Sequence, residues 1–567
     1  MKKLLAFLMA LLVLPAMVLA APATASKTVP GYGGDVTVTL TVDEGKLTDV
    51  KVEGAGETHG VGSVAVEQLP QVMLEKNSVH VDTVAGATTT SNAIFSAAEA
   101  ALKELNVELS KTEDETAQAS LEAVHTDILV VGAGGAGLAA AATAADEGAK
   151  VVLVEMLSFT GGSTAQSGGV MARGALEGDP EGTMTADELY EYLLSWSEGK
   201  ADPEVVRAYV DNAGIDQPWA FSLGDGVAET TRYHMLPENI MAIRPVGEAT
   251  AAATGIVLTR AMEKGVLDRG VDLRLNTEAT ELIVEDGKVV GAMVTGREGS
   301  YPIYARGGVI LCTGGFAQNK ELLAEYGTPN AESVIVSCTA GATGRGLIMA
   351  RDIGAKIQFG NDWDTDGYHT LAATGYTNYL NMVLVNGDGV RFHREDNQLP
   401  FIYTDMVKQT GKGMMDFYFL TDSNLEPDLP GMIAMTGAEK FDTIEALAKH
   451  IGCDLETLTK TINDYNENKG KEDPQTGKQP AYMLGLEAPY YCVKAQPIRV
   501  VTVGGVVIDK DAQVLDTNNK PIPGLYAAGE LANGSFYYNV YSACGSAVGH
   551  AIIFGRIAAR TAAATLK

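Results

Sequence analysis

A cluster of glycines early in the chain has the spacing of a turn that binds a diphosphate. Apolar residues at 126–131 predict a short buried strand before the turn, and the alanine-rich residues 138–148 predict a helix after it. Glycines let a backbone approach a diphosphate closely, and the amide groups that open a helix favour its negative charge. The glycines of this turn are Gly132, Gly134, Gly135 and Gly137.

A carboxylate follows this turn at the spacing that suits a ribose. Residues 150–155 predict a second strand that ends in Glu155, 18 residues after Gly137. A carboxylate in this place accepts hydrogen bonds from the ribose hydroxyl groups. The order of strand, glycine turn, helix, strand and acid therefore predicts a dinucleotide site of the Rossmann kind.

A hydroxyl-rich stretch at residues 82–91 is a third candidate site, because it leads directly into a predicted helix at 91–105. Three threonines and a serine end this stretch. Their hydroxyl groups could simply cap the helix, since such groups satisfy the unpaired amides of a first turn.

The elements around these sites divide the chain into several domains. With 567 residues the chain exceeds the size of one hydrophobic core, and about two to four domains are expected. Alternating residues at 35–42 and 47–52 predict a hairpin, which together with the helix at 91–105 makes residues 27–107 one small α+β domain. The polar residues 108–124 are expected to form a linker.

The formal net charge of −30 excludes some classes of partner. A strongly acidic surface repels phosphate backbones and anionic membranes, so nucleic-acid binding is not expected. The charge either keeps the protein soluble or, as a more specific hypothesis, attracts a basic electron donor that docks on the acidic surface.

The N-terminal residues 1–25 have the pattern of a secretory signal. Two lysines precede an apolar run from Leu4 to about Ala20, and small residues at 18–20 and 23–25 give two acceptable cleavage positions. An uncleaved anchor is the alternative, although the run is near the short limit for a membrane span. We therefore expect an exported protein at the periplasmic or extracellular face of the cell membrane.

The five cysteines are widely spaced and form no Cys-x-x-Cys pair. This pattern argues against a disulfide framework, against zinc and against c-type haem, so no metal site is expected. The cysteines are Cys312, Cys338, Cys453, Cys492 and Cys544.

The first domain resembles the FMN-binding domain of periplasmic flavin reductases and sodium-pumping quinone reductases. The resemblance rests on residues 31–35, 57–62 and 82–90. In that family the last threonine of the third segment carries FMN through a phosphoester bond, and Thr90 occupies this position. The resemblance therefore implies covalent FMN at Thr90.

Residues 126–567 resemble the superfamily of FAD-dependent fumarate reductases, urocanate reductases and 3-ketosteroid dehydrogenases. The resemblance rests on glycine-containing motifs at 160–169, 308–316, 342–346, 502–505 and 524–530. It implies non-covalent FAD in a Rossmann-like α/β domain made of residues 125–240 and 370–567, interrupted by a substrate-capping domain at 241–369. Besides the glycine turn and Glu155, it assigns to the cofactor Gly161, Gly162, Ser163, Gly168, Gly169, Gly314, Gly529, Glu530, Ala547 and Val548.

The positions that hold catalytic residues in the fumarate reductases differ in this chain. No arginine stands near Leu399, where those enzymes have a proton donor, and Val500 and Val501 replace a histidine pair. Residues 531–554 contain neither arginine nor lysine, so a dicarboxylate would lose its bidentate partner. Fumarate is therefore not the expected substrate.

The C-terminal motif is instead similar to that of the 3-ketosteroid dehydrogenases, in which a glycine follows a tyrosine by four residues. This resemblance implies that Tyr541 and the amide of Gly545 polarise a substrate carbonyl group. Packing of Tyr541 against the flavin is the alternative interpretation, and Tyr537 or Tyr538 could serve in its place.

Further residues are candidates for contact with the substrate. Tyr368 and the neighbouring His369 lie near the place where the fumarate enzymes keep a substrate-contacting histidine, although His369 also fits a structural role. Arg499 could bind a single carboxylate, and Arg244 could line the cap.

Together these features predict an exported, FAD-dependent oxidoreductase that acts on CH–CH groups. Electrons from a membrane or soluble donor would pass from FMN to FAD and reduce an activated alkene, an enone or an enoate, as in anaerobic respiration. Reduction of urocanate or fumarate is the alternative reaction. An electron-transfer flavoprotein without a substrate of its own is the alternative of another class.

Overall fold

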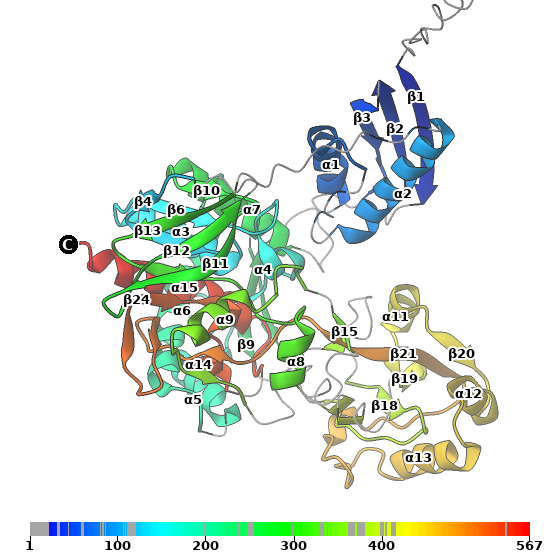
Figure 1. The fold of residues 1–567 in the computed structure, drawn as a ribbon. Coiled ribbons are helices and arrows are strands. Elements are labelled where there is room, and N and C mark those ends of the chain that lie inside the picture. The colour runs from blue at the N-terminus through cyan, green and yellow to red at the C-terminus, as the bar shows by residue number, and fades with distance from the viewer. Residues whose placement is uncertain are drawn as a thin grey trace, which may run out of the picture. The chain divides into compact units, whose positions relative to one another are not determined.

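The computed structural model describes residues 22–567 except for a set of short segments. The chain forms two compact units, Met1–Ala117 and Gln118–Lys567, whose elements are labelled in Figure 1. The residues outside the description are 1–21, 31–33, 44, 58–61, 80, 82–83, 85–86, 106, 108, 110–120, 198, 228–229, 236–238, 246–253, 297–298, 328–333, 337, 361–368, 371–379, 397–401, 403–404, 407, 410–415 and 539–540.

The first unit is a three-stranded antiparallel sheet with two helices packed against it (Figure 1). Every second residue of the middle strand is buried, because alternate side chains of a strand point to the same face. This unit confirms the small N-terminal domain expected from the sequence. Its elements are β1 (Ala23–Pro30), β2 (Asp35–Asp43), β3 (Lys46–Glu53), α1 (Gly62–Lys76) and α2 (Thr88–Leu105).

The sequence does not predict the first strand, and this strand bears on the N-terminal boundary. β1 begins at Ala23 and pairs along its whole length with β2, and Ala25 is buried. The expected signal segment, residues 1–25, lies outside the described residues as far as residue 21, whereas residues 23–25 belong to β1. Loss of all 25 residues would therefore shorten the sheet.

The second unit is built on a six-stranded sheet in the order β10-β6-β5-β14-β24-β23, in which only the edge strand β23 is antiparallel among the described strands. Every residue of β5, β6 and β14 is buried, as expected for parallel strands that are covered on both faces. The strands are β5 (Ile128–Val131), β6 (Val151–Val154), β10 (Asp272–Arg274), β14 (Val309–Leu311), β23 (Gln513–Leu515) and β24 (Pro521–Ala527).

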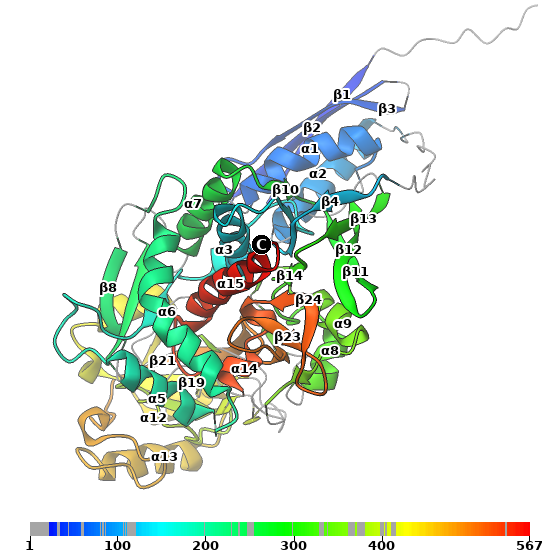
Figure 2. The same ribbon diagram turned by 90° about the vertical axis from the view of Figure 1, so that its left-hand side faces the viewer.

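Two long helices and a second sheet pack against this central sheet. The helix α15 (Ser546–Ala564) contacts both α3 (Gly135–Asp146) and β24, and Figure 2 shows α15, in red, beside α3. The second sheet has the order β11-β12-β13-β4, and its strand β12 contacts β14 and β24. Its strands are β4 (Val124–Thr126), β11 (Glu278–Glu285), β12 (Lys288–Gly296) and β13 (Gly299–Ala305).

Smaller elements complete this part of the unit. Among the described residues, no helix combines the length and the apolar character that crossing a bilayer requires. The remaining strands are β7 (Met171–Arg173), β8 (Thr230–Met235), β9 (Ile240–Pro245), β16 (Ile357–Gln358) and β22 (Gly505–Val506). The remaining helices are α4 (Gly162–Gln166), α5 (Ala186–Trp196), α6 (Pro203–Phe221), α7 (Gly255–Asp268), α8 (Lys320–Tyr326), α9 (Arg345–Asp352), η5 (Gly529–Leu531) and α14 (Gly534–Tyr537).

A separate sheet organises residues 382–499, which we call the cap region. Successive residues of its strand β19 enter two different clusters of buried apolar side chains, so the sheet has a core on each face. Its strands are β15 (Ile335–Val336), β17 (His369–Thr370), β18 (Val383–Asn386), β19 (Phe417–Thr421), β20 (Glu439–Phe441) and β21 (Tyr490–Arg499). Its helices are η3 (Ser423–Leu425), α11 (Leu429–Thr436), α12 (Ile444–Ile451), α13 (Leu455–Glu467) and η4 (Pro480–Tyr482).

The expected position of the capping domain, residues 241–369, is therefore wrong. Within that range β10 and β14 are strands of the central sheet, and β11 to β13 form one sheet with β4. Their buried side chains belong to the same core as those of β5 and β6. The separate cores lie instead in the cap region, which the sequence assigned to the FAD domain at 370–567.

Arg391 lies at the centre of a buried ion network in the cap region. Its guanidinium donates to both carboxylate oxygens of Glu395, at 2.8 and 2.6 Å, and to Asp473. The Nζ atom of Lys478 lies 3.3 Å from the same Glu395 carboxylate. Burial alone would raise the pKa of Glu395, but Lys478 and Arg391 outweigh it and hold that pKa at about 2.

Replacing Glu395 by glutamine is expected to destabilise the protein at neutral pH by about 3 to 5 kcal/mol, because Lys478 and Arg391 then stay buried without this carboxylate, although Arg391 keeps Asp473. A carboxylate with a lowered pKa stabilises the fold above its ordinary pKa of 4.5, and this contribution is lost as the pH falls toward 2. The unfolding midpoints of the parent and the variant, measured by thermal unfolding, should therefore come closer together as the pH falls from neutral to acidic.

The exposed Glu439 in the same region gives a matched control. Its replacement by glutamine should leave the unfolding midpoint unchanged, since exposed charges contribute little. A Glu395→Gln variant as stable as the parent at neutral pH would contradict the network.

Candidate active site

The glycine turn joins β5 to α3 and leaves no room for side chains. Gly132 has a φ of +97°, and a Cβ added to it would lie 2.4 Å from the carbonyl oxygen of Cys312. A Cβ on Gly137 would lie 1.7 Å from the carbonyl oxygen of Gly132. Glycine alone fits both positions, so bare backbone forms the start of α3, where amide groups favour a diphosphate.

A second glycine loop lies directly against this turn. The amide of Gly161 donates to the carbonyl oxygen of Ala133 at 2.8 Å, and Gly161 forms a β-bridge with Gly134. Gly161 and Gly162 both have positive φ, at 103° and 49°. Two segments expected from the sequence to contact one cofactor are thus adjacent.

Glu155 follows the last residue of β6 beside the glycine turn, as its spacing in the sequence predicts. Its carboxylate accepts hydrogen bonds from the amides of Ala133 at 2.7 Å and Leu157 at 2.9 Å. Burial raises the pKa of Glu155 in spite of these bonds. The acid is therefore fixed at the turn, the place in this kind of fold where a carboxylate accepts hydrogen bonds from ribose hydroxyl groups.

The neighbouring loops also fit a bound FAD. Among the described residues, the hydroxyl groups of Thr313 and Thr343 are buried and have no hydrogen-bond partner. Gly314, next to Thr313, has a φ of +70° and nothing within 4 Å of an added Cβ. Buried hydroxyl groups beside open space are what a polar ligand would satisfy.

Gly168, Gly169 and Ser163 lie in the segment around α4. The hydroxyl of Thr254 donates to the carbonyl oxygen of Gly168 at 2.5 Å, and a Cβ on Gly169 would lie 2.9 Å from the Cα of Gly255. The Ser163 hydroxyl accepts a hydrogen bond from the amide of Thr339 at 3.5 Å. This segment is therefore pressed against the start of α7.

Glu530 lies after β24 and holds the segment that contains Thr502 in place. Its carboxylate accepts hydrogen bonds from the amide and the hydroxyl of Thr502 at 2.7 and 2.9 Å. Burial, only partly offset by these bonds, raises the pKa of Glu530 to about 7. The Asn533 side chain adds two bonds, from the amide of Gly504 at 2.8 Å and to the carbonyl oxygen of Thr502 at 2.9 Å.

Tyr541 and Gly545 are brought together at the start of α15. The Gly545 amide donates to the Tyr541 hydroxyl at 2.6 Å. Gly545 caps α15 with a φ of +85°, and Ala547 and Val548 follow in the first turn. Burial raises the pKa of Tyr541 well above its ordinary value, so its phenol stays protonated at neutral pH.

Arg499 is fully buried at the end of β21, three residues before Thr502. It lies near enough to Cys338 for its charge to act on that thiol, as does Glu530. The structure thus places Arg499 close to the Glu530 segment.

Three further positions named from the sequence lie within or next to segments outside the described residues. Tyr368 and Leu399 lie outside the described residues. Of His369 the structure gives the backbone, which pairs with Pro497 in β21.

In the first unit, Thr90 lies in the first turn of α2 and is buried. Its hydroxyl donates to the Glu57 carboxylate at 2.7 Å. A Cβ on Gly62, the first residue of α1, would lie 3.0 Å from the Thr90 Oγ1 atom. Two helix starts and a carboxylate therefore surround this threonine.

The next residue, Ser91, also forms a hydrogen bond, although not with an amide of the first turn of α2. The Ser91 hydroxyl accepts a hydrogen bond from the Val84 amide at 3.0 Å, which ties the preceding loop to α2. Two adjacent hydroxyl groups thus have different partners.

The sequence does not single out Glu57, Thr502 or Asn533. Glu57 stands in a motif that carries the FMN resemblance, so the sequence marks its position. Its contact with Thr90 is not marked by any pattern in the sequence. The contacts of Asn533 depend on how two distant segments meet, and no local pattern predicts them.

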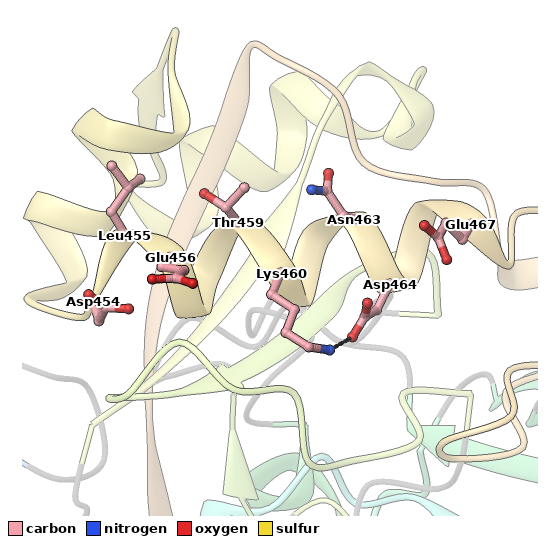
Figure 3. Close-up of a pocket in the computed structure, with 8 residues that line it drawn as sticks. All are labelled: Asp454, Leu455, Glu456, Thr459, Lys460, Asn463, Asp464 and Glu467. Carbon is pink, nitrogen blue, oxygen red and sulfur yellow. Dashed lines mark hydrogen bonds and ion pairs between the residues drawn. The ribbon is translucent and has the colours of Figure 1, made fainter.

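A surface hollow along α13 contains none of these residues. Figure 3 shows its charged lining and the ion pair between Lys460 and Asp464. It is lined by Asp454, Leu455, Glu456, Thr459, Lys460, Asn463, Asp464 and Glu467.

Comparison with known proteins identifies both parts of the chain. Residues 127–548 match the FAD binding domain family, and residues 31–103 match the FMN-binding domain family. The chain is 30% identical to a urocanate reductase of Eggerthella lenta over 95% of this chain and 91% of that protein. It is 32% identical to a probable fumarate reductase of Shewanella frigidimarina over 77% of this chain and 75% of that protein.

Solved structures agree with this assignment. The open conformation of a flavocytochrome c3 fumarate reductase is 30% identical, with a TM-score of 0.61 over 81% of this chain and 83% of that chain. A 3-ketosteroid-Δ4-(5α)-dehydrogenase from Rhodococcus jostii shares the fold, with a TM-score of 0.66 and 22% identity over 79% of this chain and 99% of that chain. The chain therefore belongs to the FAD binding domain family, carries an FMN-binding domain ahead of it, and is a flavin-dependent oxidoreductase of carbon–carbon double bonds.

Proposed function

We propose that this protein reduces an alkene conjugated to a carbonyl or carboxylate group in a small molecule outside the cytoplasm. The observation that carries the proposal is the buried pair of Tyr541 and Gly545 at the start of α15. A phenol held at a helix start can polarise a carbonyl group and deliver a proton beside it.

The two flavins would supply the electron chemistry when bound. FMN, held at Thr90, would relay electrons from a membrane or soluble donor, and FAD, held at the glycine turn beside Glu155, would be the source of the hydride for the β-carbon of the alkene. Tyr541 donates the proton that the α-carbon receives, so the product gains one hydride and one proton. Arg499 binds a single carboxylate, where the substrate has one, because a guanidinium matches that geometry. The buried setting of both side chains keeps water from competing.

The relatives support this class of reaction, since the names of two of them state reduction of urocanate and of fumarate, both small conjugated acids. Residues 531–554 lack the cation that a second carboxylate would need. A ketone or a monocarboxylate therefore suits the site better than fumarate does.

Rapid mixing of light-reduced protein with a panel of alkenes tests the reaction. We expect a conjugated ketone or a monocarboxylate other than urocanate to reoxidise the flavin fastest and to appear as the saturated product, whereas fumarate reacts slowly. Fastest reaction with fumarate or urocanate would support the alternative enzyme. No reaction with any alkene would support a role in electron transfer alone.

Replacing Tyr541 by phenylalanine is expected to lower kcat by about 10²- to 10⁴-fold, because the proton donor is removed while the ring remains. The FAD content and absorbance spectrum should stay as in the parent. Tyr526→Phe is the matched control, since Tyr526 is equally buried but hydrogen-bonds Thr565 at the other end of α15. Full activity of the Tyr541 variant would exclude this residue as the donor.

Covalent attachment of FMN at Thr90 is tested by the mass of the intact protein. The Thr90→Ala variant should lack the mass of one FMN, because no hydroxyl remains to form the phosphoester. The Ser91→Ala variant should keep it, since that hydroxyl bonds the Val84 amide instead. A Thr90 variant that still carries FMN would refute the site.

Export with cleavage of the signal is also part of the proposal, and the fold favours the earlier of the two cleavage positions. Cleavage after Ala20 leaves β1 whole, whereas cleavage after Ala25 removes three of its residues. N-terminal sequencing of the secreted protein should therefore begin at Ala21. A first residue at Ser26 or beyond would contradict this expectation.

A further inference from the structure

Tyr537 lies beside the proposed proton donor and has a fixed partner of its own. Its buried ring meets the ring of Tyr541 nearly edge-on, with the centroids 5.4 Å apart and the planes at 68°. Its hydroxyl lies 2.5 Å from the hydroxyl of Ser546. Tyr537 therefore touches both the donor and the start of α15.

Ser546 gives this contact its direction. The Ser546 hydroxyl donates its proton to the carbonyl oxygen of Ala543. The proton shared between Ser546 and Tyr537 must then come from Tyr537, because a hydroxyl group carries one proton. Ser546 is fully buried and directly follows Gly545, whose amide donates to Tyr541.

Other residues hold the loop that directly precedes α15, residues 541–545, from different sides. The Tyr192 hydroxyl donates to the carbonyl oxygen of Ser542 at 3.1 Å, which ties the loop to α5. The Ala172 amide donates to the carbonyl oxygen of Gly545 at 3.3 Å, which ties it to β7. Tyr537 supplies the tie to α14 and is the one of these contacts that also touches the ring of Tyr541.

We propose that Tyr537 is a positioning residue, which through Ser546 fixes the Gly545 amide and thereby the direction of the Tyr541 hydroxyl. It does this without touching the substrate. The inference rests on the proposed function, since it takes Tyr541 as the group that meets the substrate. Burial raises the pKa of Tyr537, so its phenol keeps the proton that this contact needs.

The Tyr537→Phe variant is the first test, in the FAD-loaded full chain and with the best alkene of the panel. We expect kcat to fall roughly fivefold to tenfold, the effect of about one hydrogen bond, and KM to change by less than about twofold. The FAD content should not change. Ser546→Ala should reproduce this pattern, and Tyr526→Phe should not. A parent-like kcat in both the Tyr537 and Ser546 variants overturns the proposal.

A double variant separates positioning from an independent contribution. In the Tyr541→Phe background, Tyr537→Phe should have no further effect on kcat, because it acts through the missing hydroxyl. If Tyr537→Phe lowered kcat by the same factor in the parent and in the Tyr541→Phe background, Tyr537 would act on its own. That result would overturn the proposal.

Crystal structures of the FAD-bound parent and Tyr537→Phe proteins give a result that does not depend on turnover. The distance from the Gly545 amide to the Tyr541 hydroxyl should exceed hydrogen-bonding range in the variant, or the Tyr541 ring should turn. Unchanged geometry overturns the positioning role even if an alkene is reduced. If no alkene reacts with the parent protein, the proposed function fails, while this comparison still decides the role of Tyr537.

Discussion

The close approach of two backbones at Gly132 and Cys312 is the constraint on which the second unit depends. Because a Cβ would lie 2.4 Å from the facing carbonyl oxygen, β5 and β14 can end side by side only with glycine at this point. β14 also pairs with β24, so the segment after β24 meets the same edge of the sheet. A Cβ on Gly529 would lie 3.0 Å from the side chain of Ala136. The glycine turn and the Glu530 segment are therefore neighbours at the carboxyl ends of parallel strands, where such sheets bind ligands.

Contacts near both ends hold the helix α15 in place, and they therefore also fix the position of its first turn. Near its C-terminal half, Asp216 of α6 lies 2.7 Å from Arg556 and 3.1 Å from Arg560. The guanidinium of Arg556 also stacks over the ring of Trp219, 3.8 Å from the ring centroid. A fully buried carboxylate needs such partners, because without them its charge would be costly in the protein interior. The helix is therefore anchored to α6 at one end while its other end carries Gly545.

Features with a local pattern could be predicted from the sequence, and features that depend on distant contacts could not. The glycine turn and the position of Glu155 follow from short-range spacing, and the two strands of the first hairpin follow from alternation. The predicted bounds of the capping domain were wrong because β10 and β14, which belong to the central sheet, have three residues each. Such strands are too short to give a periodic signal. The spacing of the sequence motif predicted that Tyr541 and Gly545 are neighbours, whereas the hydrogen bond from the Gly545 amide to the Tyr541 hydroxyl depends on backbone geometry that no spacing predicts.

The order of strands in the central sheet has a consequence for the order of events during synthesis. The centre of that sheet pairs β14 on one side with β5 and on the other with β24, which is made more than 200 residues later. Until the C-terminal segment emerges, one edge of β14 has no neighbour, and exposed edges of this kind invite pairing with other chains. The nascent polypeptide therefore exposes this edge of the sheet while the cap region is being translated, and α15 then completes the core.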